Sequence, residues 1–158
     1  MNRIQSLCKP LLCLLSVLAA ALCLSAGFLL LSREGGKQIA QNAEVWSAEL
    51  DSGESVPGIQ VPGYGILYFV EGQSKQQMTL YNPEGNPCYF EFELYVDGQD
   101  EPVYTSDLVE PGKAVTELIL DEPIAAGEHD LTVQINTYAL ENQARMNGSG
   151  VQTTLIVQ

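Results

Sequence analysis

Cys88 is the residue of this sequence whose type most suggests chemistry, because it is the one cysteine that follows residue 25. It begins the run CYFEFELYV, directly after the bend NPEGNP. A nucleophilic thiol needs a base or a cation nearby to lower its pKa. The nearest charges in the sequence are those of Glu84, Glu91 and Glu93, which raise that pKa instead. We therefore predict that Cys88 is a buried structural thiol, with an intermolecular disulfide as the alternative.

Metal ligands are the second chemistry to consider. His129 is the one histidine, and it has no cysteine or histidine partner close in sequence, so it is weak evidence for zinc. His129 is in phase with Leu131 and the apolar residues that follow at every second position. This phase predicts that His129 is partly buried at the rim of a sheet. The acidic turn Asp97–Glu101 could hold calcium, but it lacks the alternating ligand spacing of a calcium loop. Asp97-Gly98 is foremost a hairpin signal, and calcium binding there stays open.

A binding face is the third kind of site that the sequence suggests. The run 88–96 alternates with a period of two, so its residues divide between two faces of one strand. Two acids on one face would cost much free energy if they were buried without partners, which directs that face to solvent. The predicted binding face is therefore Tyr89, Glu91, Glu93 and Tyr95. The other face, predicted to point inward, holds Cys88, Phe90, Phe92, Leu94 and Val96.

Composition excludes several functions. Residues 38–158 carry three basic residues against 19 acidic ones, a net charge of −16, so they would repel nucleic acid. The sequence has no nucleophile elbow and no histidine–aspartate pair at a suggestive spacing. We predict that the protein is not an enzyme and needs no cofactor.

The N-terminal segment indicates a membrane anchor. Residues 11–31 are 21 positions without a charge. About 20 apolar residues cross a bilayer as a helix, whereas the apolar core of a cleaved signal peptide has roughly 7–15. We predict a cytoplasmic N-terminus at 1–10 and a transmembrane signal anchor at 11–31. Cleavage after the small residues that end at Gly27 is left open.

Charge also predicts the orientation of that anchor. Arg3 and Lys9 precede it and Arg33 and Lys37 follow it, which gives a slight bias toward a cytoplasmic N-terminus. The anionic cytoplasmic leaflet would repel so acidic a domain. We therefore expect a single-pass plasma-membrane protein that contacts lipid through its anchor and carries its C-terminal domain outside the cytoplasm.

Residues 32–58 are polar and read as a stalk or linker. Within them Ile39, Ala43, Trp46 and Leu50 follow spacings of 4, 3 and 4, which fit one face of a helix. A linker without a helix is the alternative.

From residue 59 onward the pattern is that of an all-β domain. Short runs of alternating apolar and polar residues are separated by turns rich in Gly, Pro, Asn and Asp. They predict an antiparallel β-sandwich of about seven to eight strands over residues 59–158, preceded by one transmembrane helix. The predicted strands are 59–61, 67–70, 76–81, 88–96, 102–104, 114–120, 128–138 and 151–157.

The domain contains the motifs Asn82-Pro83, Cys88-Tyr89-Phe90, Tyr104, Ser106-Asp107-Leu108, Glu110-Pro111-Gly112-Lys113 and Ala126-Gly127. These motifs resemble those of small membrane-anchored proteins of Clostridia-type Firmicutes that have no assigned activity. The resemblance covers residues 59–158 and implies an Ig-like β-sandwich. That family tends to have tyrosine at the position of His129, which implies that His129 replaces a structural ring. In this layout Gly112 and Gly127 are expected to supply a positive φ at bends.

The sequence thus favours a non-catalytic, membrane-anchored extracytoplasmic binding or structural module, set in an envelope or conjugation-type assembly. A protein partner at the cell surface would bind an exposed sheet edge by strand addition, or the tyrosine and glutamate face of strand 88–96. The alternative is a carbohydrate-binding module that stacks sugar rings on exposed tyrosines.

Overall fold

The computed structural model describes residues 36–46 and 58–158. The chain divides into two compact units, Met1–Gly36 and Lys37–Gln158, and the account below concerns the second. The predicted anchor, residues 11–31, lies outside the described residues. Within the described ranges no helix is long and apolar enough to span a bilayer.

The second unit is all-β, as the alternating sequence pattern predicts, and its described residues contain no helix. The strands are β1 (Glu44–Val45), β2 (Leu67–Phe69), β3 (Lys75–Asn82), β4 (Cys88–Val96), β5 (Tyr104–Thr105), β6 (Lys113–Ile119), β7 (Gly127–Ala139) and β8 (Ser149–Val157). Gly112, in the turn before β6, has φ 74°, and Gly127, the first residue of β7, has φ 146°, which confirms the positive φ expected for both glycines.

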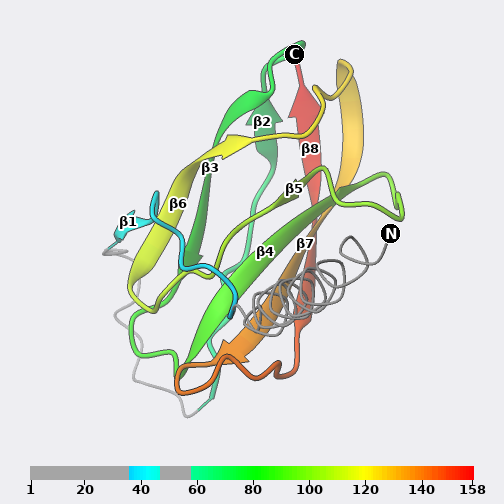
Figure 1. The fold of residues 1–158 in the computed structure, drawn as a ribbon. Coiled ribbons are helices and arrows are strands. Elements are labelled where there is room, and N and C mark those ends of the chain that lie inside the picture. Colours follow the sequence, from blue (N-terminus) through cyan, green and yellow to red (C-terminus); the bar gives the residue numbers. More distant parts are fainter. Residues whose placement is uncertain (1–35, 47–57) are drawn as a thin grey trace, which may run out of the picture. The chain divides into compact units, whose positions relative to one another are not determined.

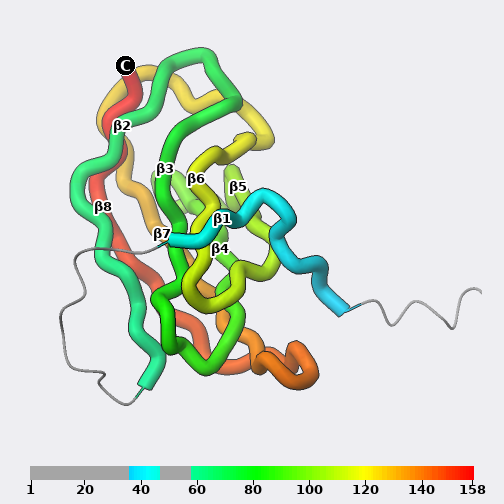
Figure 2. Tube along the Cα trace, turned by 90° about the vertical axis from the view of Figure 1, so that its left-hand side faces the viewer, coloured from blue at the N-terminus to red at the C-terminus, as the bar shows by residue number. Residues whose placement is uncertain are grey.

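These strands form two sheets. One has three strands in the order β1-β6-β3, and the other has five in the order β2-β8-β7-β4-β5 (Figure 1). Figure 2 shows the unit from the side, with β2 and β8 on the left and β3 and β6 to their right. This two-sheet arrangement is consistent with the predicted sandwich. One pairing corrects the antiparallel prediction, because β2 runs parallel to β8.

The core lies between the two sheets. The inward face of β4 is as predicted, since each of its five residues is at most 3% exposed. The rings of Phe90 and Phe92 meet edge to face, with centroids 5.8 Å apart. Apolar residues of both sheets complete the core, including Leu80, Val115 and Leu118 from β3 and β6 and Leu131, Val133 and Ile135 from β7.

The turn after β4 also follows the prediction. Asp97 and Gly98 have φ angles of 50° and 68°, and the Gln99 N–H donates to the Val96 carbonyl at 3.1 Å. Two successive positive φ angles are those of a type I′ turn, whose twist matches that of antiparallel strands. This turn begins the connection from β4 to its antiparallel neighbour β5.

Two predicted strands need correction. Residues 59–61 form no strand, because the backbone of Gln60 bonds the side chain of Asn86 instead of a neighbouring strand. The strand predicted at 102–104 lies at Tyr104–Thr105.

The helical interpretation of the stalk is wrong where the structure describes it. Ile39 forms a parallel bridge with Leu108, and β1 pairs antiparallel with β6. Leu50, the last residue of the proposed helix face, lies outside the described residues. Residues 37–46 therefore belong to the same compact unit as the sandwich.

Candidate functional site

The predicted binding face of β4 is not uniformly exposed. Tyr89, Glu93 and Tyr95 are half-buried, but Glu91 is only 5% exposed, which corrects the prediction that it faces solvent. The penalty for burying a carboxylate is large only when the charge has no partners, and Glu91 has three.

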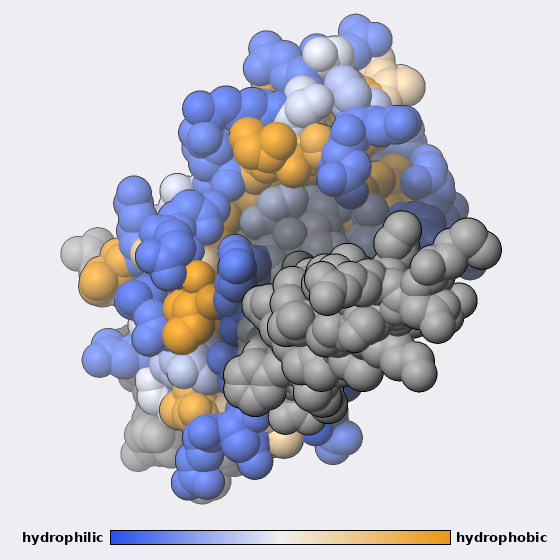
Figure 3. All heavy atoms as spheres, in the orientation of Figure 1, coloured by the Kyte–Doolittle hydropathy of each residue, from blue (hydrophilic) through white to orange (hydrophobic). Residues whose placement is uncertain are grey.

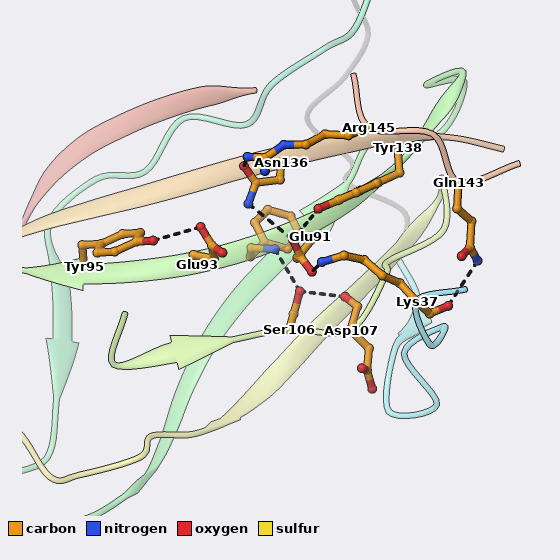
Figure 4. Close-up of polar contacts among 11 residues, drawn as sticks. Lys37, Glu91, Glu93, Tyr95, Ser106, Asp107, Asn136, Tyr138, Gln143 and Arg145 are labelled. Carbon is orange, nitrogen blue, oxygen red and sulfur yellow. Dashed lines mark hydrogen bonds and ion pairs between the residues drawn. The ribbon is translucent and has the colours of Figure 1, made fainter. Parts of the chain in front are cut away.

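Those partners come from two separate parts of the chain, the segment that begins at Lys37 and strand β7 (Figure 4). Glu91 Oε1 accepts a charged hydrogen bond from Lys37 Nζ. Glu91 Oε2 accepts one from the Tyr138 hydroxyl at 2.9 Å and a weaker one from Asn136 Nδ2 at 3.3 Å. The register of β4 with β7 places Asn136 directly opposite Glu91, and Tyr138 is two residues further along the same face.

Lys37 is held by more than its ion pair. Its Nζ lies 4.9 Å from the centroid of the Tyr138 ring, within cation–π range, and its carbonyl accepts from Gln143 Nε2 at 3.2 Å. Burial pushes the Lys37 pKa down, but hydrogen bonds to Glu91 and Tyr138 more than offset this, so the pKa lies above its usual 10.5. The resting group is therefore an ammonium ion.

Asn136 is the most enclosed amide of this site, at 4% exposure. Its Nδ2 points to Glu91, and its Oδ1 accepts from Arg145 Nη2 at 3.1 Å. The two ends of the carboxamide are thus held by opposite charges. We call Lys37, Glu91, Asn136, Tyr138 and Arg145 the Glu91 cluster.

The cluster fastens the start of the domain to its central strands. Beyond Lys37, the Leu108 N–H donates to the Gln38 carbonyl and the Ala40 N–H donates to the Leu108 carbonyl, both at 2.9 Å. Ala40 is 4% exposed, and the Trp46 N–H donates to the Gly112 carbonyl at 2.9 Å. The segment from Lys37 to Trp46 is therefore attached at both of its ends.

The rest of the outer face of the five-stranded sheet is polar with scattered rings. Strand register aligns Tyr95 with Thr132 on β7, and Tyr89 with Tyr138. On the far edge Tyr68 is 61% exposed and lies beside Ile156. Figure 3 shows one side of the molecule, where hydrophilic side chains predominate and apolar ones form small separate groups.

Cys88 lies apart from this face, in the core. It is a free thiol without exposed surface, and burial raises its pKa. This confirms the predicted buried, structural cysteine. A thiol in this position cannot reach a second chain, so the intermolecular disulfide is not supported.

His129 lies at the rim of the sandwich, as predicted. Its Nδ1 is 2.7 Å from Asp97 Oδ2 and its Nε2 is 2.9 Å from the Ala125 carbonyl. The other oxygen of Asp97 accepts from the Asp130 N–H at 3.0 Å. The side chain of Asp97, the first residue of the acidic turn at residues 97–101, is therefore bonded to the start of β7. Across residues 36–46 and 58–158, no three His, Cys, Asp or Glu side chains are grouped to hold a metal ion.

The Asp97–His129 pair predicts a specific pH dependence. The hydrogen bond to Asp97 raises the His129 pKa above 6.5, and the same bond lowers the Asp97 pKa below 3.8. The histidine contribution to stability is complete below pH 6.5 and is lost as pH rises through the raised pKa. The aspartate contribution is complete above pH 3.8 and is lost as pH falls through the lowered pKa. The pair thus stabilises the fold fully between these two values.

An NMR titration of the imidazole protons measures this directly. We expect the His129 pKa to lie above 6.5 in the wild type and to fall in Asp97→Asn. The interpretation is wrong if the two proteins titrate alike.

The sequence places Glu91 in the predicted binding face but does not identify the residues that bond its carboxylate. Asn136 and Tyr138 share the polar phase of β7, a signal that becomes informative only when the register with β4 is known. Lys37 lies in the predicted stalk, and Arg145 follows the last residue of β7 by six positions. Comparison of the chain with models of protein families, with curated proteins and with solved structures gave no match.

Proposed function

We propose that this chain is a non-catalytic, membrane-anchored module whose Ig-like domain binds a protein partner outside the cytoplasm. The strand order supports the Ig-like assignment. The sequence β8-β7-β4-β5 follows the order G-F-C-C′ of variable-type Ig sheets, and β6-β3 follows the order E-B of the opposing sheet. The chain's own β1 occupies the edge position beside β6.

The proposed location follows from the N-terminus and from the charge. A stretch of 21 residues without a charge precedes a strongly acidic domain, which suits an anchored protein exposed on the outer side of the membrane. Membrane lipid would contact the anchor alone. An envelope or conjugation-type assembly is the setting that we propose for the domain.

The observation that carries the binding role is the outer face of the five-stranded sheet. Glu93, Glu128 and Asp130 lie on this face by strand phase, together with the rings of Tyr95 and Tyr68. Lys37 is engaged with Glu91 and His129 with Asp97. Among residues 36–46 and 58–158 these three acids form no ion pair. A face that combines tyrosines with such acids is complementary to a protein surface that presents lysine or arginine.

Site-specific photocrosslinking in cells tests this role. A photoreactive amino acid is placed in the full-length chain at Tyr95, on the proposed face. The matched control carries it at Gln77, an exposed residue of β3 on the other sheet. We expect a discrete protein adduct from position 95 that weakens at high salt and is absent from position 77. Equal adducts from both positions, or none from position 95, would contradict the proposal.

A carbohydrate-binding module is the second candidate, and the exposure of Tyr68 favours it. A ring that is 61% exposed beside Ile156 offers a flat apolar surface for a sugar ring. Screening the full-length chain in detergent against a glycan array distinguishes the two functions. Binding that Tyr68→Ala abolishes and Gln77→Ala preserves would favour this candidate over a protein partner.

A further inference from the structure

The Glu91 cluster brings together the reactants for an amide bond between two side chains. It contains a primary amine, a carboxamide and a carboxylate that bonds both of them. We propose that Lys37 and Asn136 become joined by an isopeptide bond, and that Glu91 transfers the protons. The reaction occurs once in each molecule, so it is a self-modification and lies beyond the binding function.

Asn136 is arranged as the electrophile. Its Oδ1 lies 3.1 Å from Arg145 Nη2, so the guanidinium polarises the carbonyl and stabilises the negative charge that forms when the carbon becomes tetrahedral. Its Nδ2, which must leave, lies 3.3 Å from Glu91 Oε2. Both Asn136 and Glu91 are at least 95% buried, which keeps competing water away from the carbonyl carbon.

Lys37 is arranged as the nucleophile. Its Nζ bonds Oε1 of the same carboxylate whose Oε2 faces the Asn136 amide, and the Tyr138 ring lies beside it (Figure 4). The raised pKa means that the ammonium ion must first give a proton to Glu91. This proton transfer makes the reaction slow, and a higher pH should accelerate it. Slowness is tolerable because the groups are held together and each molecule reacts once.

The step balances without an oxidant or a reductant. Glu91 takes a proton from the ammonium ion, and the freed lone pair of Nζ attacks Cγ of Asn136. The new C–N bond forms, and the bond from Cγ to Nδ2 breaks. Of the three ammonium protons, one stays on the amide and one joins the departing nitrogen, which leaves as ammonia. The third passes through Glu91 to solvent or to that ammonia.

The bond would have a structural purpose. It would join the first residue of the compact unit to the central strand β7, across a large part of the domain. The part of the chain that the structure describes has one cysteine, which is free and buried. An isopeptide bond would provide the covalent bracing that disulfides provide in other exported domains.

Intact mass spectrometry of the full-length protein in detergent is the test. We expect a mass about 17 Da below that of the sequence, the loss of one ammonia, either at once or after incubation at about pH 9. Proteolytic digestion should then give one branched peptide that joins Lys37 to Asn136.

Three variants complete the experiment. Lys37→Arg keeps the positive charge and Glu91→Gln keeps the shape of the carboxylate, and both should retain the full mass while circular dichroism confirms that they fold. The matched control is Lys113→Arg, which alters another lysine paired with a glutamate, Glu110, and should still lose ammonia.

Three results would overturn the proposal. One is an unchanged wild-type mass after the incubation. Another is a loss of about 18 Da with a link from Lys37 to Glu91, which would be a different condensation. The last is a gain of about 1 Da at Asn136 without a link, which would mean that water and not Lys37 attacks the amide.

Discussion

Replacing Phe92 with alanine is expected to lower the free energy of unfolding of the domain by about 3–5 kcal/mol. Phe92 has no exposed surface, it lies at the middle of β4, and its ring contacts the ring of Phe90. The substitution removes apolar area from the core and leaves a cavity that the two paired sheets cannot close. Urea unfolding followed by far-ultraviolet circular dichroism measures the change.

Tyr95→Ala is the matched control for this prediction. It removes an aromatic ring from the same strand but from the opposite, half-buried face. We expect a loss of about 1 kcal/mol or less for this variant, since surface substitutions have small effects. Equal losses for the two variants would mean that β4 does not separate a core face from an outer face.

Replacing Glu91 with alanine is expected to cost about 2–3 kcal/mol, measured against wild-type protein in which Lys37 and Asn136 are not yet joined. The variant leaves the Tyr138 hydroxyl and Asn136 Nδ2 without their acceptor in a buried site. It also removes the ion pair of Lys37, whose side chain is 46% exposed and can still be hydrated, and this limits the loss. Residues 37–46 should exchange their amide hydrogens faster, because the cluster attaches this segment to the sheet.

Glu93→Ala provides the comparison on the same face of β4. Glu93 is half-buried, and its carboxylate accepts one hydrogen bond from Tyr95 at 3.0 Å. We expect a loss of less than about 1 kcal/mol and no change in the exchange of residues 37–46. If Glu91→Ala behaves like Glu93→Ala in both measurements, the Glu91 cluster does not fasten the segment.

The sequence predicts local features of this protein well. The strand at 88–96, its inward face and the Asp97-Gly98 turn are all as expected. These features depend on neighbouring residues, because a strand alternates its side chains with a period of two and a type I′ turn requires two positive φ angles. Such information lies within a few positions of the chain.

The candidate site is different, because its partners are far apart in sequence. The alternation of β4 assigns Glu91 to the outer face, and burial of an unpaired acid is costly, so exposure was the reasonable expectation. The structure buries Glu91 because Lys37, 54 residues away, and Tyr138, 47 residues away, supply the compensating charge and hydrogen bond. No periodic pattern of the sequence specifies which strands meet.

By itself, therefore, the sequence determined the all-β class, most of the strands, the inward position of Cys88 and the acidic character of the domain. The tertiary structure alone decided that β2 runs parallel to β8, that residues 37–46 join the sandwich, and that Glu91 is buried. The physical reason is the separation along the sequence of the residues on which each property depends. Alternation, turn geometry and charge are properties of a short stretch, whereas register and burial arise only when distant strands pair and exclude water between them.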